Sequence, residues 1–557
     1  MKFSQIPYKR VELNPSLKKL QELLDGFKAA ATAEEAFEAY KEIDSFSESY
    51  STMFSLGVIR HTLDTNDKFY DAENDYIDET VPKFMPLEQE ITKAVLASPY
   101  RKDLEAKWGT VMFDRAEMEL KTFKPEIVAD LQEENKLTSE YDKLIASAQI
   151  EYDGKTLTLA QLYPYHEDPD RSVRKASMRA RAEWFMKNSK QLDELFDKLV
   201  KLRTEIAKKL GYNNFVELGY YRMGRLCYGA SEVDKFRKAV VSHIVPISVK
   251  LKEAQAKRIG VDSIKIYDND CLYLDGNAKP KGTPDEIFAH GKNMYHELSN
   301  DTAEFIDFML ENELFDVLTR PGKQSGGYCA YLDDYKSPFI FANFNGTAGD
   351  IDVLTHEAGH AYAAFEARNA YPSGLREYSM ETAEIHSMAM EFFAWPYMEG
   401  FFGEQTKKYY ESHLSGALTF IPYGTMVDEF QHHIYEKPEM TPDERNKLWL
   451  ELEAKYRPYL DQKDFPFYGD GRRWQAQGHI YCNPFYYIDY CLAQTVALQF
   501  WVQDQRDHKT AWQKYCRLVK LAGTKTFTDL LKDAGIPTPF EDEPIKDISD
   551  SVDKWLN

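Results

Sequence analysis

The chain has 557 residues and a formal net charge of −22, and 43% of its residues are hydrophobic and 29% charged. This composition is typical of a globular protein and excludes a collagen, a long disordered chain and a disulfide-rich scaffold. A chain this acidic gains no affinity for nucleic acid from counterion release and is repelled by anionic lipid, so we expect neither as a partner.

The cysteines and the N-terminal residues indicate the cellular compartment. No Cys-x-x-Cys pair occurs, and thinly spread cysteines are typical of reduced thiols that pack in a core. The N-terminus lacks the apolar segment of a signal peptide, and no stretch approaches the roughly 20 apolar residues that span a bilayer. We therefore expect a cytoplasmic protein. The cysteines are Cys227, Cys271, Cys329, Cys482, Cys491 and Cys516.

Helical periodicity runs through the first part of the chain, to about residue 150. Leu17, Leu20, Leu24 and Phe27, for example, share one helical face with charged residues between them. The same pattern returns after residue 347 and continues almost to the end of the chain. The sequence therefore predicts a mostly α fold.

The pattern is interrupted between residues 150 and 170, where a turn is predicted at Asp153-Gly154. Asp168 and Pro169 then predict the N-cap and first position of a further helix. This helix carries a basic stripe, which we interpret as a solvated, salt-bridged face rather than a carboxylate-binding site. The stripe consists of Arg171, Arg174, Lys175, Arg179 and Arg181.

One clear β signal lies between residues 326 and 345. The aromatic-rich runs Tyr328–Tyr331 and Pro338–Asn345 are separated by a short polar segment and predict a small hairpin. The preceding GKQSGG segment does not have the spacing of a phosphate-binding loop, so we interpret it as a turn. The fold is then mostly α with a small sheet.

The sequence His356-Glu357-Ala358-Gly359-His360 carries the strongest chemical signal. Two histidines four residues apart lie on the same face of a helix, so both imidazoles can bind one Zn²⁺. Glu357 follows the first histidine and can act as general base toward a zinc-bound water. By chance alone the pattern arises in roughly 3% of chains with this composition, so further residues are needed to support it.

Three glutamates in the following helix supply that support. Glu381, Glu384 and Glu391 share a helical face, and two histidines with a downstream glutamate form an established zinc ligand set. Glu381 and Glu391 could orient the ligand imidazoles through N–H···carboxylate bonds. The alternative is a hydrated helix face, but the other side chains of this helix are apolar, and buried carboxylates need partners. His386 projects about 200° away from Glu384 around the helix, so we exclude it as a ligand.

HEAGH followed by ETAEIHSMAMEF resembles the zinc site of the thimet oligopeptidase and oligoendopeptidase F family. Two further stretches are similar to the oligoendopeptidase F branch, namely LTLAQLYPYHEDPDRSVRKAS before the motif and GHIYCNPFYYIDYCLAQ after it. The resemblance spans roughly residues 150 to 500. It implies a large helical, two-lobed, zincin-type peptidase with a small β-sheet beside the active site and a deep substrate channel. We expect an N-terminal helical region at 1–200 and the zinc metallopeptidase catalytic region at 201–557.

The resemblance also implies roles for individual residues. It makes His356, His360 and Glu384 the ligands of one Zn²⁺ per chain, and it makes Glu357 the general base. It also makes His479 and a nearby tyrosine the groups that stabilise the transition state.

The register of that tyrosine is open. Tyr487 and Tyr490 lie on one helical face and fit best, while Tyr486 is the fallback and a candidate substrate contact. Phenol and imidazole groups both donate hydrogen bonds to an oxyanion. The alternative for each tyrosine is core packing with a satisfied hydroxyl.

The predicted hairpin suggests how substrate is held. Zinc peptidases commonly bind a peptide as an added strand on an exposed sheet edge. We expect PFIFANFN to be this edge, with Ala342 and Asn343 as backbone partners. Gly326 and Gly327 resemble the mobile substrate-side loop of the family. The alternative is an ordinary hairpin that binds no ligand.

Together these features predict a zinc metalloendopeptidase that hydrolyses internal bonds of short oligopeptides. One alternative is a zinc carboxypeptidase or dipeptidyl carboxypeptidase with the same motif. Another is a non-catalytic peptide-binding helical protein, which is disfavoured because a binding protein does not need the base Glu357.

Overall fold

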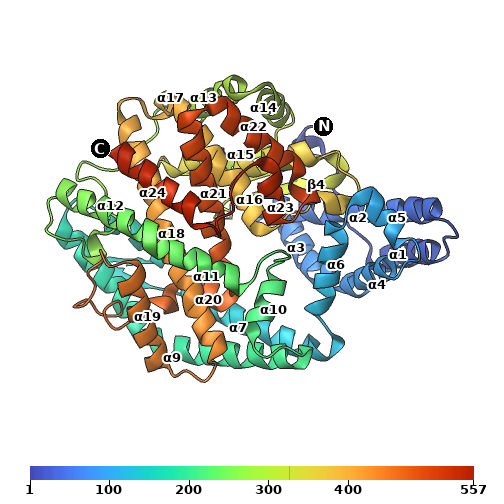
Figure 1. The fold of residues 1–557 in the computed structure, drawn as a ribbon, viewed down its shortest axis with the longest axis horizontal. Coiled ribbons are helices and arrows are strands. Elements are labelled where there is room, and N and C mark those ends of the chain that lie inside the picture. The colour runs from blue at the N-terminus through green and yellow to red at the C-terminus, as the bar shows by residue number, and fades with distance from the viewer. Residues whose placement is uncertain (325, 557) are drawn as a thin grey trace. The chain divides into compact units, whose positions relative to one another are not determined.

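The computed structural model describes residues 1–324 and 326–556. Helices dominate these ranges, and the strands are few and short (Figure 1). The predicted mostly α fold with a small sheet is therefore confirmed. Within the same ranges, no helix is both long and apolar enough to cross a membrane.

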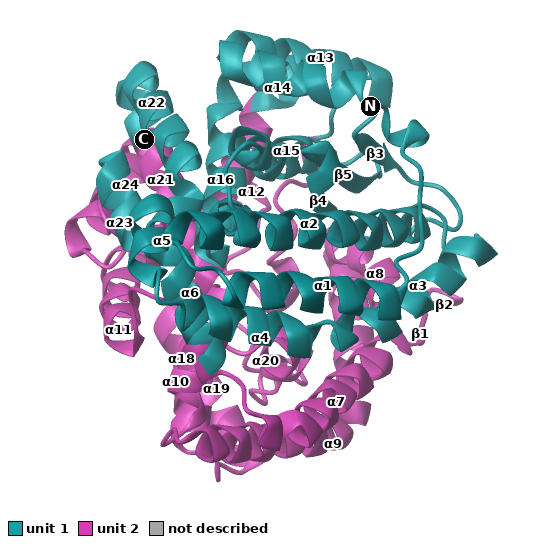
Figure 2. Cartoon of the chain, turned by 90° about the vertical axis from the view of Figure 1, so that its right-hand side faces the viewer, with its two compact units in different colours: residues 1–120, 279–406, 503–536 teal, residues 121–278, 407–502, 537–557 magenta. Residues whose placement is uncertain are grey.

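The chain forms two compact units, and each unit is assembled from three separate segments (Figure 2). Unit 1 consists of residues 1–120, 279–406 and 503–536. Unit 2 consists of residues 121–278, 407–502 and 537–557. Residue 200, the expected boundary between the two regions, lies inside the longest helix, and the division at this residue stays a prediction.

Unit 1 begins with helices whose apolar faces form one core. The predicted face of the first helix is buried there through Leu20, Leu24 and Phe27. The Thr32 side chain caps the second helix by accepting a hydrogen bond from the N–H of Glu35. The helices that lie wholly or mainly in unit 1 are α1 (Leu13–Lys28), α2 (Ala33–Leu63), α3 (Lys68–Thr80), α4 (Met85–Leu96), α5 (Arg101–Trp108), α6 (Val111–Lys121), α13 (Pro284–Leu298), α14 (Asn300–Glu311), α15 (Gly349–Ala367), α16 (Met380–Phe393), α17 (Met398–Phe402), α22 (His508–Leu521) and α23 (Phe527–Ala534).

A three-stranded sheet in unit 1 lies against α15. Its strand order is β3-β5-β4, in which β5 (Ser337–Phe344) pairs parallel with β3 (Phe315–Leu318) and antiparallel with β4 (Tyr328–Leu332). The register pairs Tyr328 of β4 with Phe341 of β5. The predicted hairpin is confirmed, whereas β3 was missed because four residues are too few to reveal a strand pattern.

Unit 2 is also mostly helical. Its longest helix, α9, ends at Gly211, whose φ of 99° lies in the left-handed region that favours glycine. The elements that lie wholly or mainly in unit 2 are α7 (Val128–Ala146), β1 (Ile150–Tyr152), β2 (Lys155–Leu157), α8 (Leu159–Leu162), α9 (Arg171–Leu210), α10 (Phe215–Arg222), α11 (Ala230–Ala239), α12 (Val245–Arg258), α18 (Thr406–Glu436), α19 (Pro442–Tyr456), α20 (Gly478–Cys482), α21 (Tyr487–Arg506) and α24 (Asp542–Leu556).

The predicted turn at Asp153-Gly154 is confirmed, whereas the N-cap of α9 differs from the prediction. The N-cap is Asp170, whose carboxylate accepts the N–H of Ser172, while Asp168 accepts the N–H of Asp170 in the preceding loop. Asp153 and Gly154 both have positive φ and join β1 to β2 as a hairpin turn. These strands were missed because three residues cannot show a clear alternation.

Two arginines of the basic stripe of α9 are salt-bridged as predicted, but their partner is a buried acid rather than a solvated one. Arg174 and Arg171 both pair with the buried carboxylate of Asp268, at 3.0 and 2.7 Å. Arg174 is itself almost completely buried. These arginines therefore neutralise an internal acid.

Candidate functional site

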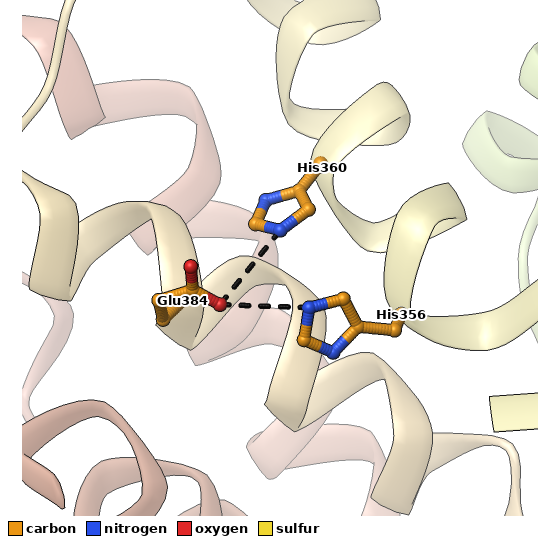
Figure 3. Close-up of side chains that lie close together, drawn as sticks. All are labelled: His356, His360 and Glu384. Carbon is orange, nitrogen blue, oxygen red and sulfur yellow. Dashed lines mark ion pairs between the residues drawn. The ribbon is translucent and has the colours of Figure 1, made fainter. Parts of the chain in front are cut away.

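Two packed helices bring the predicted metal ligands together. His356, Glu357 and His360 lie on α15, and Glu384 lies on α16. The two imidazoles and the Glu384 carboxylate point toward one another (Figure 3), and their ligand atoms all lie within 4.8 Å of one another. Oε2 of Glu384 is 3.5 Å from Nε2 of His356 and 3.8 Å from Nε2 of His360.

Gly359, inside the motif, allows α15 and α16 to approach so closely. A Cβ at this position would lie 2.5 Å from the carbonyl oxygen of His386 and 2.6 Å from Cα of Ser387. The α16 backbone therefore occupies the space that a side chain would need, and this approach brings Glu384 within reach of both imidazoles. The motif tolerates any residue at position 359, so the spacing alone does not reveal the role of Gly359.

Each of the two imidazoles makes a hydrogen bond to a group other than Glu384. Nδ1 of His356 donates to Oε1 of Glu391 at 2.6 Å, which confirms the predicted contact. His360 hydrogen-bonds the backbone of Ala383. These bonds orient both rings so that Nε2 faces Glu384. Glu381 is buried in the first turn of α16, and its contact with a ligand imidazole stays a prediction.

Burial and neighbouring charges shift the pKa values of these groups in the protein alone. Burial opposes a charge on His356, but hydrogen bonds with Glu384 and Glu391 outweigh it and raise its pKa well above the ordinary value. Burial and the charge of His356 lower the pKa of His360 to about 4. Burial opposes ionisation of Glu384, but the two histidines hold its pKa below the ordinary value. The site thus gathers carboxylates around two imidazoles, an arrangement that a divalent cation stabilises.

The donor set fits a catalytic zinc ion. Two imidazole nitrogens and one carboxylate oxygen form an established three-ligand set that leaves a fourth position open. The side chains of His356 and His360 remain 27% and 19% exposed, so the site has an open side. His386 is turned away, as predicted, with its ring against Tyr378 at 4.8 Å between centroids.

Glu357 lies beside the loop that leads into β4. A Cβ on Gly327 would be 3.8 Å from Oε1 of Glu357, so this loop passes next to the carboxylate. Gly326 has a φ of 99°, which a residue with a side chain rarely adopts. Burial is the largest cause of a raised pKa of Glu357, and the charges of Glu384 and Glu391 add to it although His356 opposes them. A raised pKa suits a carboxylate that accepts and releases a proton.

The prediction that PFIFANFN forms the sheet edge is wrong. β5 is the central strand because β3 pairs on its other side, and β4 is an outer strand. The carbonyl of Ala342 accepts a hydrogen bond from Lys323, and the side-chain amide of Asn343 donates to the carbonyls of Gln324 and Gly326. These groups therefore hold the loop before β4 rather than offering a free edge to a peptide.

The predicted histidine and tyrosines form one cluster in unit 2. The ring centroid of His479 is 5.7 Å from that of Tyr486, 4.8 Å from that of Tyr487 and 6.1 Å from that of Tyr490. All three tyrosines are only half-buried, so none is an ordinary core residue. The geometry keeps all three as candidates for the register.

Residues that the sequence analysis missed hold this tyrosine segment. Phe485, directly before it, has a left-handed φ of 69°. Its N–H donates to Gln431 at 2.9 Å, and its carbonyl accepts a hydrogen bond from Arg225, which also pairs with Asp489 at 2.8 Å. Gln431 and Arg225 lie 54 and 260 residues from Phe485 in the sequence. No local pattern could have revealed partners so distant.

Two protein-family descriptions match most of the chain. Residues 3–123 match the Peptidase M3 N-terminal domain, and residues 165–549 match Peptidase family M3. The chain belongs to peptidase family M3. The predicted oligoendopeptidase F-like assignment is therefore confirmed, and this M3 peptidase is of the oligopeptidase type.

Three relatives of this M3 peptidase align with it over nearly its whole length. It is 22% identical over 589 aligned residues to oligopeptidase PepF of Bacillus subtilis, covering 95% of this chain and 81% of that protein. It is 49% identical to a solved structure of a putative oligoendopeptidase F, with a TM-score of 0.91 and coverage of 100% and 98%. PZ peptidase A, solved with an inhibitor, gives the same identity and TM-score with coverage of 100% and 99%.

Proposed function

We propose that this M3 peptidase is a zinc-dependent metalloendopeptidase that hydrolyses internal bonds of short oligopeptides. The observation that carries the proposal is the convergence of His356, His360 and Glu384 next to Glu357 in a chain of this family. The two histidines and Glu384 would hold one zinc ion per chain. Zinc bound there supplies a Lewis acid that polarises the scissile carbonyl and makes a water easier to deprotonate.

Glu357 acts as the general base in this proposal. It takes a proton from the attacking water and passes it to the leaving amine. Its raised pKa supports this role, because the carboxylate then holds the proton more readily between the two steps. Its position beside Gly327 supports a substrate path along this loop, with Gly326 and Gly327 as substrate contacts.

His479 and one tyrosine donate hydrogen bonds to the oxyanion that forms during attack. The family resemblance supports this role, and the clustering of Tyr486, Tyr487 and Tyr490 around His479 is compatible with each register. Ala342 and Asn343 are not retained as backbone partners. The outer strand β4 replaces β5 as the candidate for pairing with an extended peptide.

Digestion of a defined peptide set with and without a chelator tests the proposal. Peptides of roughly 5–20 residues that are blocked at both ends should be cut internally, as judged by mass spectrometry. An extended peptide advances about 3.3 Å per residue, so peptides of this length suit a substrate channel. Chelation should abolish cleavage, and Zn²⁺ should restore it. Substitution of His356, His360 or Glu384 by Ala should lower metal content from about one ion per chain.

The alternatives predict other results. A carboxypeptidase or dipeptidyl carboxypeptidase requires the free C-terminal carboxylate, so C-terminal blocking would abolish its activity. A binding protein would retain peptides without cutting them. Full activity of the metal-free protein would contradict the zinc site itself.

A further inference from the structure

The imidazole of His479 has different neighbours at its two nitrogens. Nδ1 lies 3.0 Å from Nε2 of Gln477, while Nε2 has no hydrogen-bond partner among the residues that the structure describes. Tyr486 stacks on the ring and Tyr487 meets it edge-on, so the plane of the ring is fixed, and the contact with Gln477 places Nδ1 on one edge of it. Only Nε2 is therefore available to a ligand.

The orientation of the Gln477 side chain follows from its other contact. Its amide oxygen lies 2.6 Å from the hydroxyl of Tyr423. This length is typical of O–H···O hydrogen bonds and short for N–H···O bonds, so the amide oxygen faces Tyr423 and the NH₂ group faces His479. An NH₂ group only donates, so Nδ1 of His479 must accept.

The protonation state of the ring agrees with this assignment. Burial lowers the pKa of His479, so the imidazole is neutral at neutral pH. The titratable groups that face it are the phenols of Tyr486, Tyr487 and Tyr490. Burial raises the pKa of Tyr487, which keeps this phenol uncharged. A neutral ring whose Nδ1 accepts a hydrogen bond carries its proton on Nε2.

We infer that Gln477 is a positioning residue that fixes the Nε2–H tautomer of His479. Tyr423 sets the orientation of the Gln477 amide, and Gln477 in turn makes the open nitrogen of His479 a hydrogen-bond donor. The inference rests on the proposed function where it assigns a use to this donor, namely the oxyanion. The tautomer itself follows from the contacts within unit 2.

The Gln477→Glu variant tests the inference, because Glu has the same shape but accepts a hydrogen bond. The neutral ring then carries its proton on Nδ1, and Nε2 carries a lone pair and can no longer donate a hydrogen bond. At low pH the new carboxylate stabilises an imidazolium, which still donates from Nε2. The ratio of kcat in the variant to kcat in the wild type should therefore fall as pH rises, to about 1/100 at pH 9, with KM nearly unchanged.

Gln477→Met is the matched control, because Met has similar size and forces neither tautomer. Its kcat ratio should be modestly below one and independent of pH. If Gln477 had a purely structural role, Gln477→Glu should lower kcat less than Gln477→Met, and both kcat ratios should be independent of pH. That result would overturn the inference.

Nitrogen NMR of ¹⁵N-histidine-labelled protein gives a readout that does not depend on activity, with His479→Asn used to assign the signal. An Nε2–H signal in the wild type that becomes Nδ1–H in Gln477→Glu at pH 9 supports the inference. An Nδ1–H signal in the wild type overturns it. The expected NMR change with a flat kcat ratio supports tautomer control by Gln477 but overturns the proposed role of His479 as oxyanion donor.

Discussion

Adjacent residues on one turn of α15 have different tasks because the helix turns them about 100° apart. His356 faces Glu384 on the neighbouring helix, whereas Glu357 faces the loop at Gly327. At the scale of single residues, the i, i+4 spacing of the motif predicted that His356 and His360 face the same side, and the glutamates of the next helix predicted their partner. The contact between His356 and Glu391 was also predictable, since Glu384 and Glu391 are seven residues apart on one helical face.

Glu357 is proposed as the base and not as a metal ligand, which gives a prediction for the Glu357→Gln variant. The amide cannot take a proton from the attacking water, so kcat should fall by at least 10²-fold. Metal content and affinity for a non-cleavable peptide should remain close to wild type. Metal analysis, calorimetry and peptide hydrolysis measure the three quantities.

Glu366→Gln is the control for this experiment, because Glu366 lies on the same helix and pairs with Lys520 at 3.5 Å. It should retain activity. Loss of the metal in Glu357→Gln would instead identify Glu357 as a ligand and contradict the assigned role.

At the scale of elements, the site depends on how closely α15 and α16 pack and on the order of the strands. Sequence periodicity predicted both helices, but it contains no information about the distance between them, which Gly359 sets. The strand order was unpredictable for a related reason. β3 has only four residues and pairs with β5 through a parallel register, so nothing local in the sequence marks β5 as central.

Substitution of Gly359 by Ala should separate the two helices. The new Cβ would meet the backbone of His386 and Ser387, which cannot move aside as a flexible side chain can. We expect lower zinc affinity, a loss of activity and a stability decrease of about 1–3 kcal/mol. Metal titration and thermal unfolding measure these effects.

Gly26→Ala is the matched control within the same unit. Gly26 lies on α1, and a Cβ there has no atom within 4 Å. This variant should keep its metal and gain up to about 1 kcal/mol of stability, because Ala favours a helix over Gly. Equal zinc affinity in Gly359→Ala and the wild type would show that the close approach does not matter for the site.

At the scale of the whole molecule, buried histidines make stability depend on pH. Burial lowers the pKa values of His166 and His432 to about 4, and Tyr220 lies 2.9 Å from Nε2 of His432. Between about pH 6.5 and pH 4 the unfolded chain binds more protons than the folded chain. The free energy of unfolding should therefore fall as pH decreases through this window, by up to about 1.4 kcal/mol per pH unit for each histidine.

Urea unfolding at several pH values between 4 and 7 measures this dependence. His432→Gln should make the slope shallower, because Gln can still hydrogen-bond Tyr220 but does not titrate. A free energy of unfolding that is constant from pH 6.5 to 4.5 would contradict the prediction.

The alternation of segments between the two units has a consequence for how the protein is made. Synthesis proceeds from the N-terminus, so residues 1–120 leave the ribosome long before residues 503–536, which complete the same unit. The hydroxyl of Tyr515, on α22, donates a hydrogen bond to the carbonyl of His386 on α16. The helix that carries Glu384 is therefore supported by a residue that is synthesised near the end of the chain. A nascent chain that already contains HEAGH therefore lacks part of its final support. If this site holds zinc as proposed, we expect full zinc affinity only after nearly the whole chain has been synthesised.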